Sequence, residues 1–548
     1  MFKKVWSSYN IDIAKKDVFP LIKRTRHTEY IAAQALNNQI IPFPNFQSVP
    51  YNQEIWTTKK QKEYGNSYQL YIHSLRVGVE LILEYEKTFN IDYLLKAKDL
   101  IEGWINFSQK KNNPRMLWTD HPTSNRVQVI VHFLYHANKT NIRYNKKTYK
   151  KILLKHAYVL SDPKNYRNYN HGIMMDRALL VLGNILNKKE LYKLGYYRSI
   201  DTFWHSFSSQ GIHLENSPEY HNMVVRMYNE IESYLNQYND SFGKNIIGYL
   251  KMAQEYPKIM MRNDKTLPSI GDSGRGKYKY TKQYKNIFDV EAGISLLQNK
   301  ELQMYLTFIC GYSTDTHKHK DDLSITFNYQ GKDFFVDPGK YNYSKSDIRN
   351  YIVSEKAHSS FMPLNISYNI KYNNRFNKKV SLTNYLETSE YTLVRGEHKD
   401  FDNEKLMLKR TVIMSKELPL FIIIDESENN EKLDYIQRYN LHEDVIITNQ
   451  FNNEVHLKHE DTEITIQQFM PTIINVTEGS VKEATAVNAI AFGKVKETKQ
   501  IQFQRNTKEK NVFKTVIYDK SLINEILIDN KEVIANTKDS KIKINLLI

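Results

Sequence analysis

The sequence predicts an α+β chain of two domains, in which a helical array is followed by antiparallel strands. Three observations carry this prediction. The chain has 548 residues, whereas a single hydrophobic core rarely grows beyond about 250–300 residues. Apolar residues recur at every third or fourth position between about residues 65 and 260, the period of a helix. After about residue 295 they recur at every second position, the period of a strand.

The first half of the chain has the apolar spacing of amphipathic helices. Tyr68, Tyr71, Ile72, Leu75 and Val79 are three or four positions apart, so they share one helix face. Helices repeated in pairs and joined by short turns predict an α/α array, either closed into a toroid or stacked as a solenoid. The same spacing returns in the segments 130–135, 152–160, 175–182 and 231–235.

The second half alternates apolar and polar residues, as in residues 325–329, and is divided by turn signals. The unbroken apolar run from Leu420 to Ile424 is typical of a strand buried on both faces. Turns at Gln330-Gly331 and Asp337-Pro338-Gly339 favour an antiparallel sandwich over a parallel sheet. The predicted domains are residues 1–295, which are helical, and residues 296–548, which form the β-sandwich.

The composition is that of a globular protein with a strongly basic charge balance. Hydrophobic residues make up 41% and charged residues 25% of the chain, which argues against extensive disorder. The net charge of +16 favours anionic partners, although scattered lysines are usually a solvated surface. The chain has 39 Tyr and only 5 Trp. Tyrosine can stack on a sugar and also form hydrogen bonds, although a compositional bias explains the excess equally well.

The single cysteine limits the kinds of metal site that the chain can form. Cys310 can form no intramolecular disulfide and no multi-thiolate site, so any metal must be held by histidines and carboxylates. The N-terminal segment lacks the apolar stretch of a signal peptide. No segment approaches the roughly 20 apolar residues of a membrane span. We therefore expect no membrane span, and a cytoplasmic location unless the true N-terminus is missing, in which case the protein is exported.

The first candidate motif pairs Asn170 with His171 before a predicted amphipathic helix. An amide and an imidazole can donate hydrogen bonds to a carboxylate. If that carboxylate belongs to a uronic acid, its neutralisation stabilises the enolate that forms when the sugar loses its C5 proton. A simple helix cap is the alternative interpretation of this pair.

The second motif runs from Glu215 to His221 and contains a helix start. Ser217 can cap the helix and Pro218 suits its first turn, so Tyr220 would project from a rigid element. A tyrosine there can act as a general base or general acid. Packing is the alternative role for Tyr220, and Tyr228, two turns further along, is the second candidate tyrosine.

The third motif contains His317 and His319, followed by Asp337 and His358. Two histidines two positions apart on a strand point to the same face. An aspartate and a later histidine complete an N/N/O ligand set that suits zinc. A histidine-rich surface turn is the alternative.

A fourth segment, Gly271 to Gly276, is a glycine-rich loop without the spacing of a phosphate-binding loop. Arg275 in this loop could contact an anionic sugar, and a plain surface loop is the alternative.

Taken in order, these segments resemble the heparinase II/III-type polysaccharide lyases, closely over about residues 165–360. Outside that stretch only the helix-then-strand layout agrees. The resemblance is carried by Asn170-His171-Gly172, Ser217-Pro218-Glu219-Tyr220-His221, Gly271-Asp272-Ser273, His317-Lys318-His319-Lys320-Asp321 and Ala357-His358-Ser359.

The resemblance implies an (α/α) toroid followed by an antiparallel β-sandwich, with an acidic glycan in the cleft between them. It implies that Asn170 and His171 neutralise the uronate carboxylate, and that Tyr220 and His317 share the acid and base roles. It also implies a structural zinc ion. The predicted ligands of the zinc ion are His319, Asp337 and His358, and the residues predicted to bind substrate are Arg275 and His221.

The predicted activity is therefore β-elimination on a uronic-acid-containing polysaccharide, such as a glycosaminoglycan or a capsule polymer. Many degradative relatives carry an export signal, and none is visible here. A role in making or trimming the cell's own capsule is therefore a further hypothesis. Two alternatives remain open. One is a glycoside hydrolase on the same scaffold, with carboxylates from Glu215, Glu219 and Asp176. The other is a non-catalytic protein that binds acidic glycans. A nucleic-acid partner is not expected, because no basic helix or zinc finger is present. The oligomeric state is not predicted.

Overall fold

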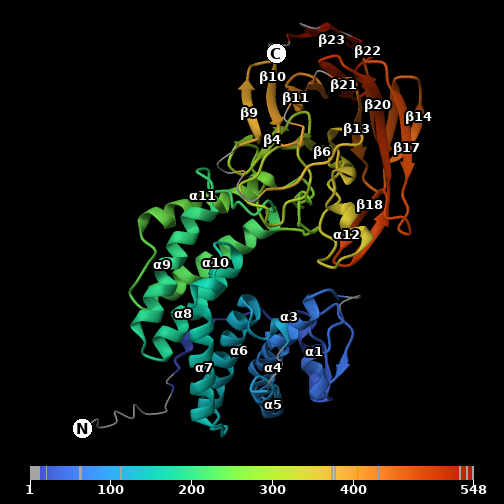
Figure 1. Ribbon diagram of the computed structural model, residues 1–548. Coiled ribbons are helices and arrows are strands. Elements are labelled where there is room, and N and C mark those ends of the chain that lie inside the picture. The colour runs from blue at the N-terminus through green and yellow to red at the C-terminus, as the bar shows by residue number, and fades with distance from the viewer. Residues whose placement is uncertain are drawn as a thin grey trace. The chain divides into compact units, whose positions relative to one another are not determined.

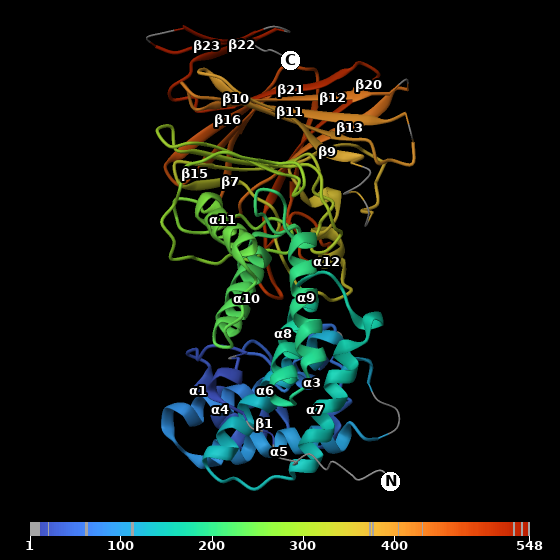
Figure 2. The same ribbon diagram turned by 90° about the vertical axis from the view of Figure 1, so that its left-hand side faces the viewer.

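The chain folds into two compact units. One unit comprises Met1–Ser206 with Arg226–Gly248, here called the helical unit, and the other comprises Phe207–Val225 with Tyr249–Ile548, here called the strand unit. Figures 1 and 2 show the helices of the first and the sheets of the second. The structure, a computed structural model, describes residues 11, 13–19, 21–60, 64–110, 114–371, 374, 378–403, 405–429, 431–529, 532–538 and 541–545.

Amphipathic helices dominate the helical unit, as their apolar spacing predicts. The side chains of α8 are almost all buried, and α9 packs along this helix. The chain boundaries between the units fall directly after α9, within α10 and within α11. The helices are α1 (Thr28–Leu36), α3 (Ser67–His73), α4 (Arg76–Thr88), α5 (Ile91–Phe107), α6 (Asp120–Lys139), α7 (Lys146–Ser161), α8 (Asn170–Ile185), α9 (Lys189–Ser206), α10 (Pro218–Asn236) and α11 (Lys244–Met260), and the short strands β1 (Gln39–Ile40) and β2 (Val49–Pro50) pair with each other.

One predicted helix is divided in two. The apolar spacing from Tyr68 to Val79 predicts a continuous helix, but α3 ends at His73 and α4 begins at Arg76. Leu75 between them has a φ of 57°, in the left-handed region, where the helical hydrogen-bond pattern cannot continue. The apolar face persists across the break because Leu75 itself is buried.

Antiparallel sheets make up most of the strand unit. Its three main sheets have eight, five and four strands, in the orders β14-β15-β16-β21-β12-β11-β10-β9, β3-β4-β5-β6-β7 and β17-β20-β13-β8. All their pairings are antiparallel. Smaller sheets pair β18 with β19 and join β22, β23 and β24. The predicted order of helices followed by antiparallel strands is confirmed.

The strands have the following bounds. They are β3 (Ile287–Asp289), β4 (Ile294–Asn299), β5 (Met304–Ile309), β6 (Ser324–Tyr329), β7 (Lys332–Phe335), β8 (Phe361–Pro363), β9 (Val380–Glu387), β10 (Tyr391–His398), β11 (Met407–Ser415), β12 (Leu420–Glu428), β13 (Leu433–Asn440), β14 (Ile446–Gln450), β15 (Glu454–His459), β16 (Thr462–Gln468), β17 (Ile473–Glu478), β18 (Val487–Ala491), β19 (Lys494–Glu497), β20 (Lys499–Thr507), β21 (Asn511–Tyr518), β22 (Glu525–Ile528), β23 (Glu532–Asn536) and β24 (Lys541–Asn545). The unit also contains the short helix α12 (Asp347–Ile352).

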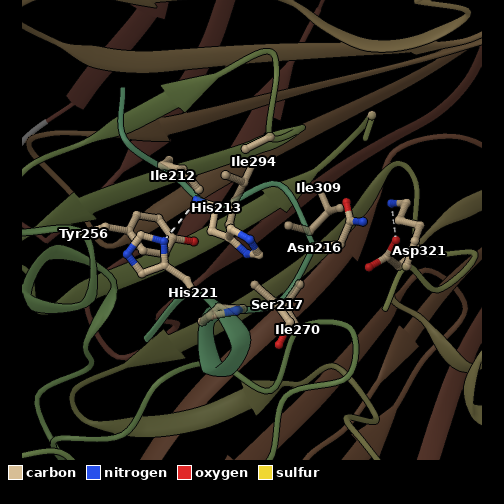
Figure 3. A pocket seen from close by; sticks show the side chains of 14 residues that line it. Ile212, His213, Asn216, Ser217, His221, Tyr256, Ile270, Ile294, Ile309 and Asp321 are labelled. Carbon is tan, nitrogen blue, oxygen red and sulfur yellow. Dashed lines mark hydrogen bonds and ion pairs between the residues drawn. The ribbon is translucent and has the colours of Figure 1, made fainter. Parts of the chain in front are cut away.

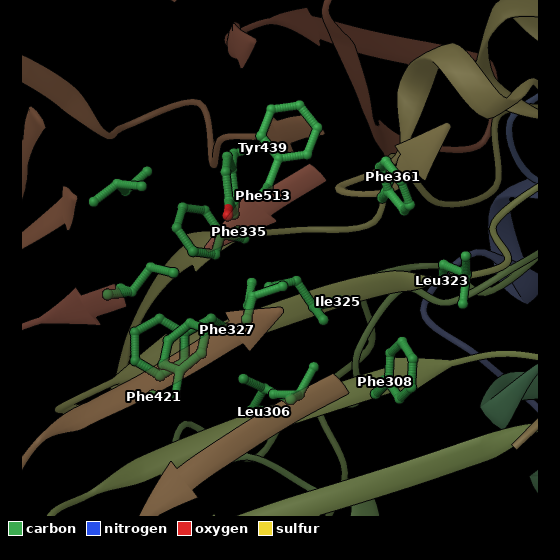
Figure 4. Close-up of a cluster of buried hydrophobic side chains, with 14 of the residues drawn as sticks. Leu306, Phe308, Leu323, Ile325, Phe327, Phe335, Phe361, Phe421, Tyr439 and Phe513 are labelled. Atoms are coloured by element: carbon green, nitrogen blue, oxygen red, sulfur yellow. The ribbon is translucent and has the colours of Figure 1, made fainter. Parts of the chain in front are cut away.

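The main core of the strand unit lies between its sheets (Figure 4). Phe327 of the five-stranded sheet packs on Phe421 of the eight-stranded sheet, with ring centroids 4.7 Å apart. Phe335 packs in the same way on Tyr439 of the four-stranded sheet, at 4.9 Å. The run predicted to be a fully buried strand forms the start of β12, whose side chains are buried from Leu420 onward. The sandwich is therefore held together by aromatic and branched apolar side chains from all three sheets.

The five-stranded sheet is buried on both faces. Along β5, Leu306 and Phe308 face the main core, whereas Tyr305 and Ile309 face a second core that includes the end of α11. Such alternation is the period-two signature of a strand. Because both faces are covered, β5 and β6 form a rigid support for the loop that connects them, and this loop contains the predicted histidines.

Candidate active site

The first element of the site is the beginning of α10. Ser217 precedes Pro218, the first residue of the helix, and its hydroxyl accepts a hydrogen bond from the Tyr220 backbone N–H at 3.3 Å. The predicted cap is therefore confirmed. The Ser217 hydroxyl is also 2.7 Å from that of Ser273, so the helix start is tied to the glycine-rich loop. This arrangement fixes the position of the Tyr220 side chain.

The second element is the segment between β5 and β6 that contains His317 and His319. The prediction that this segment is a strand is wrong, because His317 has a φ of 58° and the chain forms a turn there. The Asn216 amide donates to the carbonyls of Thr314 and Thr316, at 2.8 and 2.9 Å. The segment before Tyr220 is therefore joined to the segment before His317.

Gly271 allows the two segments to approach closely. A Cβ atom at this position would lie 2.5 Å from the carbonyl oxygen of Asn216 and 2.8 Å from that of His317. Gly271 also has a φ of 56°, a conformation that costs glycine little. Glycine at this position of the predicted glycine-rich loop therefore permits both the close approach and the left-handed backbone conformation.

The rings of Tyr220 and His317 are stacked. Their centroids are 3.6 Å apart and their planes differ by 22°. The Tyr220 hydroxyl is 2.7 Å from the hydroxyl of Tyr343, whose side chain is 42% exposed. A phenol and an imidazole predicted to share proton transfer therefore lie side by side, and they come from segments almost a hundred residues apart.

Asp272 organises the histidines of the site. Its carboxylate is 3.0 Å from Nδ1 of His317 and 3.1 Å from Nε2 of His319. The Arg349 guanidinium donates to both carboxylate oxygens, at 2.6 and 3.1 Å. Burial opposes ionisation, but the hydrogen bonds from His317 and His319 hold the pKa of Asp272 well below its usual value. Asp272 is therefore an anion that orients both imidazole rings.

The surroundings shift the pKa values of both candidate catalytic residues, His317 and Tyr220. Burial opposes protonation of His317, but hydrogen bonds to Asp272 and Glu215 raise its pKa above 6.5. Nε2 of His317 is 3.4 Å from Glu215. Burial raises the pKa of Tyr220 above 10, so its phenol carries a proton near neutral pH. A protonated phenol can donate a proton or a hydrogen bond to an oxygen atom of a substrate.

Two further charged residues at this end of the strand unit are ion-paired. Glu219 accepts a hydrogen bond from Lys340 at 2.8 Å and another from the Gly274 N–H at 2.6 Å. Arg275 forms a bidentate pair with Glu443. Burial opposes ionisation of Glu443, but hydrogen bonds from Arg275 lower its pKa to about 2. A substrate anion would therefore have to compete with Glu443 for Arg275.

His221 is a buried structural residue. Its Nδ1 accepts a hydrogen bond from the His213 N–H at 3.0 Å, and its Nε2 donates to the Ala253 carbonyl at 2.7 Å. Both ring nitrogens are engaged by the backbone, which favours a structural role over the predicted sugar contact. His221, His213 and Tyr256 line a cavity of about 20 Å³ (Figure 3). The cavity has space for about one water molecule and is too small for a sugar.

We expect His221→Ala to lower the free energy of unfolding of the strand unit. We also expect this free energy to depend less on pH in the variant than in the wild type. The variant leaves the His213 N–H and the Ala253 carbonyl unpaired, at a cost of about 1–3 kcal/mol each. Burial lowers the pKa of His221 to about 3 from its usual 6.5. The unfolded chain therefore binds more protons between these values, and His221 lowers the free energy of unfolding as pH falls below 6.5.

Urea unfolding at neutral and at mildly acidic pH measures both effects. His456→Ala, on the partly exposed strand β15 of the same unit, is the matched control. Equal stabilities of the His221 and His456 variants would contradict the structural role of His221.

The predicted zinc ligands form a buried cluster. His319 and His358 are fully buried and their ring centroids are 5.6 Å apart. Nδ1 of His358 is 3.0 Å from Asp337. Nδ1 of His319 and Nε2 of His358 are buried without a hydrogen-bond partner in the structure. Two unpaired buried imidazole nitrogens fit a zinc ion, which would satisfy both.

Asp337 follows the end of β7, where the sequence predicts it. It lies behind His358, as carboxylates do when they orient an imidazole bound to a metal. Within the described part of the chain, the ligand atoms of His319, Asp337 and His358 are not among the triads that lie within 4.8 Å of one another. The geometry thus fits two histidine ligands, with Asp337 in a supporting position.

Asn170 and His171 begin α8 in the helical unit. The sequence placed them before the helix, but α8 starts at Asn170 and its N-cap is Tyr169, which makes no side-chain capping bond. The capping alternative for this pair is therefore not supported. Asn170 is 3% exposed, and Nδ1 of His171 is 3.1 Å from Asp120 of α6. The side chain of His171 remains 31% exposed, so it can meet a ligand.

The sequence did not identify several residues that hold the candidate catalytic groups in place. The Gly271-Asp272-Ser273 motif was noted, but nothing indicated that Asp272 binds two histidines and an arginine. Tyr343 and Arg349 lie in no recognisable motif, and one tyrosine among 39 carries no signal. Asp120 is about fifty residues away from His171 in the sequence. Their roles follow only from the fold.

Comparisons with known proteins concern the family and the fold. Residues 288–523 match the family model "Heparinase II/III-like, C-terminal". No curated protein matches the chain. A solved heparinase III is similar over 99% of this chain and 92% of its own, with a TM-score of 0.77 and 16% identity. Heparan sulfate lyase HepC from Pedobacter heparinus is similar over 97% and 91%, with a TM-score of 0.67 and 15% identity.

A more distant structure has a related fold. Chondroitin AC lyase from Streptomyces coelicolor A3, solved with chondroitin sulphate, covers 94% of this chain and 83% of its own, with a TM-score of 0.54 and 6% identity. At these identities the likeness concerns the fold, which is the predicted helical toroid followed by a β-sandwich. Residues 288–523 are therefore similar to the heparinase II/III-like C-terminal family, and the chain as a whole has the fold of the heparinase III structures.

Proposed function

We propose that this protein is a polysaccharide lyase that cleaves an acidic, uronic-acid-containing polysaccharide by β-elimination. The observation that carries the proposal is the stacked pair of Tyr220 and His317, with Asp272 behind the imidazole. The proposal is supported by the family match of residues 288–523. It is also supported by the fold shared with a heparan sulfate lyase and a chondroitin AC lyase, and by the net charge of +16.

The proposed reaction needs two proton transfers and no water. A base removes the C5 proton of the uronate, the electron pair forms the C4–C5 double bond, and the C4–O bond breaks. An acid then protonates the leaving oxygen. We assign these transfers to Tyr220 and His317 together. The phenol of Tyr220 is protonated and can donate to the leaving oxygen, whereas His317 in its neutral form can accept a proton at Nε2 while Nδ1 is held by Asp272.

Asn170 and His171 are proposed to donate hydrogen bonds to the uronate carboxylate. This role rests on their motif and on the exposed imidazole of His171. Neutralising that carboxylate stabilises the negative charge that develops as C5 loses its proton. Arg275 would take part only if substrate displaced Glu443.

A structural zinc ion bound by His319 and His358, with Asp337 as a further ligand or support, is part of the proposal. It is supported by the two unpaired buried nitrogens. The ion would crosslink the β5–β6 loop to the segment before β8, and it would take no part in proton transfer.

The direct test is the growth of ultraviolet absorbance during incubation with uronate polymers. The new double bond is conjugated with the carboxylate, so each cleavage adds one chromophore. The panel should include heparan sulfate, chondroitin sulfate, alginate-type polymers and capsule polysaccharides. Absorbance growth with at least one polymer is expected, and no growth with any polymer would count against the proposal.

A glycoside hydrolase is the second candidate function, and Glu219→Gln distinguishes it. A hydrolase needs two carboxylates that act on the glycosidic bond, and Glu219 is a candidate from the sequence. Because Glu219 is bound to Lys340 and Gly274, we expect Glu219→Gln to retain more activity than Tyr220→Phe. Loss of activity in the glutamate variant with full activity in the tyrosine variant would favour the hydrolase. Binding of polymer without any product would favour the non-catalytic alternative.

A further inference from the structure

A cluster of two histidines and one glutamate in the helical unit has the arrangement of a metal site. His132 and His136 lie one turn apart on α6, and Glu86 lies on α4. These two helices pack against each other. Residues four positions apart on a helix share one face, so both imidazoles are directed toward the same carboxylate.

The ligand atoms of this cluster already lie close together. Nε2 of His132 is 3.0 Å from Oε1 of Glu86, and Nε2 of His136 is 2.9 Å from the same oxygen. All three ligand atoms lie within 4.8 Å of one another. Around a tetrahedral zinc ion with bonds of about 2.1 Å, ligand atoms are roughly 3.4 Å apart. Side-chain movements of a few tenths of an ångström would thus bring both Nε2–Oε1 distances to this value.

The lysine that follows Glu86 in the sequence is paired with other carboxylates. Lys87, the next residue on α4, is directed to Glu29 at 3.1 Å and to Glu84 at 3.9 Å. The hydrogen bonds to Oε1 of Glu86 come from the two imidazoles.

The two imidazoles are buried and the carboxylate is more exposed. This difference suits a metal ion that keeps one coordination position open to solvent. The side chain of His132 is 4% exposed and that of His136 is 12% exposed, whereas that of Glu86 is 40% exposed. The rings of Tyr85 and Tyr135 contact His136, with centroids 5.3 and 4.9 Å away. The imidazoles are thus held in place, while the carboxylate side remains open to water as a fourth ligand.

A second triad in the described part of the chain is less suited to a metal. His442, Asp444 and His459 also bring their ligand atoms within 4.8 Å. However, His442 is 3.8 Å from Asp444, and Asp444 is bound by Lys496 at 2.8 Å. The lysine neutralises the carboxylate that would have to attract the ion.

We propose that Glu86, His132 and His136 bind a divalent transition-metal ion, with zinc as the ion best matched to two imidazoles and one carboxylate. The ion links α4 to α6 within the helical unit. It is separate from the zinc ion proposed for the strand unit and is independent of the lyase activity. Because the ion binds the folded unit, it raises the temperature of unfolding.

The test is zinc binding by the 548-residue chain after chelator treatment. Zinc is titrated against a chromophoric chelator, and the number of zinc ions bound per chain is compared between the wild type and His136→Gln. The proposed site in the strand unit is unchanged in both proteins, so its contribution cancels. His27→Gln, in the same unit and outside the cluster, is the matched control.

We expect the wild type and the His27 variant to bind one zinc ion per chain more than the His136 variant. Loss of one ligand should weaken this site by more than about a hundredfold. Zinc should also raise the unfolding temperature of the wild type more than that of the variant. Equal stoichiometry and equal temperature shifts in all three proteins would overturn the proposal.

A second variant distinguishes the loss of a metal ligand from a folding defect in His136→Gln. Glu86→Gln alters the most exposed member of the cluster and keeps the volume of the side chain. It should show the same loss of one zinc ion, with a circular dichroism spectrum like that of the wild type. Retention of that ion in a folded Glu86 variant would contradict the ligand set.

Discussion

Tyr220→Phe is expected to reduce lyase activity by about 10²–10⁴-fold without unfolding the protein. The substitution removes only the hydroxyl, whose partner in the structure is the hydroxyl of Tyr343. The ring and its stacking on His317 remain. The loss should appear in kcat, because the proton is transferred in the transition state. Initial rates of ultraviolet absorbance growth over a range of polymer concentrations give kcat and KM.

Tyr228→Phe is the matched control for this prediction. Tyr228 lies two turns further along α10 in the helical unit, and its buried hydroxyl donates to the Ser199 carbonyl at 3.0 Å. Its loss should cost about 1 kcal/mol of stability and leave kcat near that of the wild type. An inactive Tyr228 variant beside an active Tyr220 variant would reverse the assignment of the catalytic tyrosine.

His317→Asn should reduce activity to a similar extent, by about 10²–10⁴-fold. Asparagine is the suitable replacement because His317 has a φ of 58°, and asparagine tolerates the left-handed conformation better than most residues. The backbone of the loop is therefore preserved while the imidazole is lost. The same rate assay measures the loss, and circular dichroism verifies the fold.

His456→Asn provides the control for the loss of an imidazole. His456 lies on β15 of the same unit, where it pairs with Glu454 at 3.1 Å. Its replacement should leave the rate unchanged. Wild-type activity in His317→Asn would remove the imidazole from the proposed proton transfer and leave Tyr220 to act without it.

The helices and strands were predictable because burial imposes a period on the sequence. The run from Leu420 to Ile424 forms a fully buried stretch of β12, and Ser217-Pro218 starts a helix as expected. The break at Leu75 was not predictable, because the apolar spacing continues across it while the backbone changes conformation. Periodicity records which face is buried, and it carries no signal for a single residue in the left-handed region.

The candidate site was predictable only in part. Tyr220 and His317 belong to recognisable motifs, and the structure stacks them on each other. Their supports, Asp272 and Arg349, act through contacts that span 45 and 77 positions of the sequence. Such contacts depend on the fold and leave no local pattern. Arg275 was assigned to the substrate for its charge, but its partner Glu443 is 168 positions away.

The most direct test of eliminative cleavage is mass analysis of products formed in water labelled with heavy oxygen. Elimination breaks the C4–O bond without adding water, so the fragment with the new non-reducing end should be lighter by one water than a hydrolysis product. Neither fragment should carry label from bond cleavage. Label in a product of full hydrolytic mass would contradict the account and assign the protein to the hydrolases.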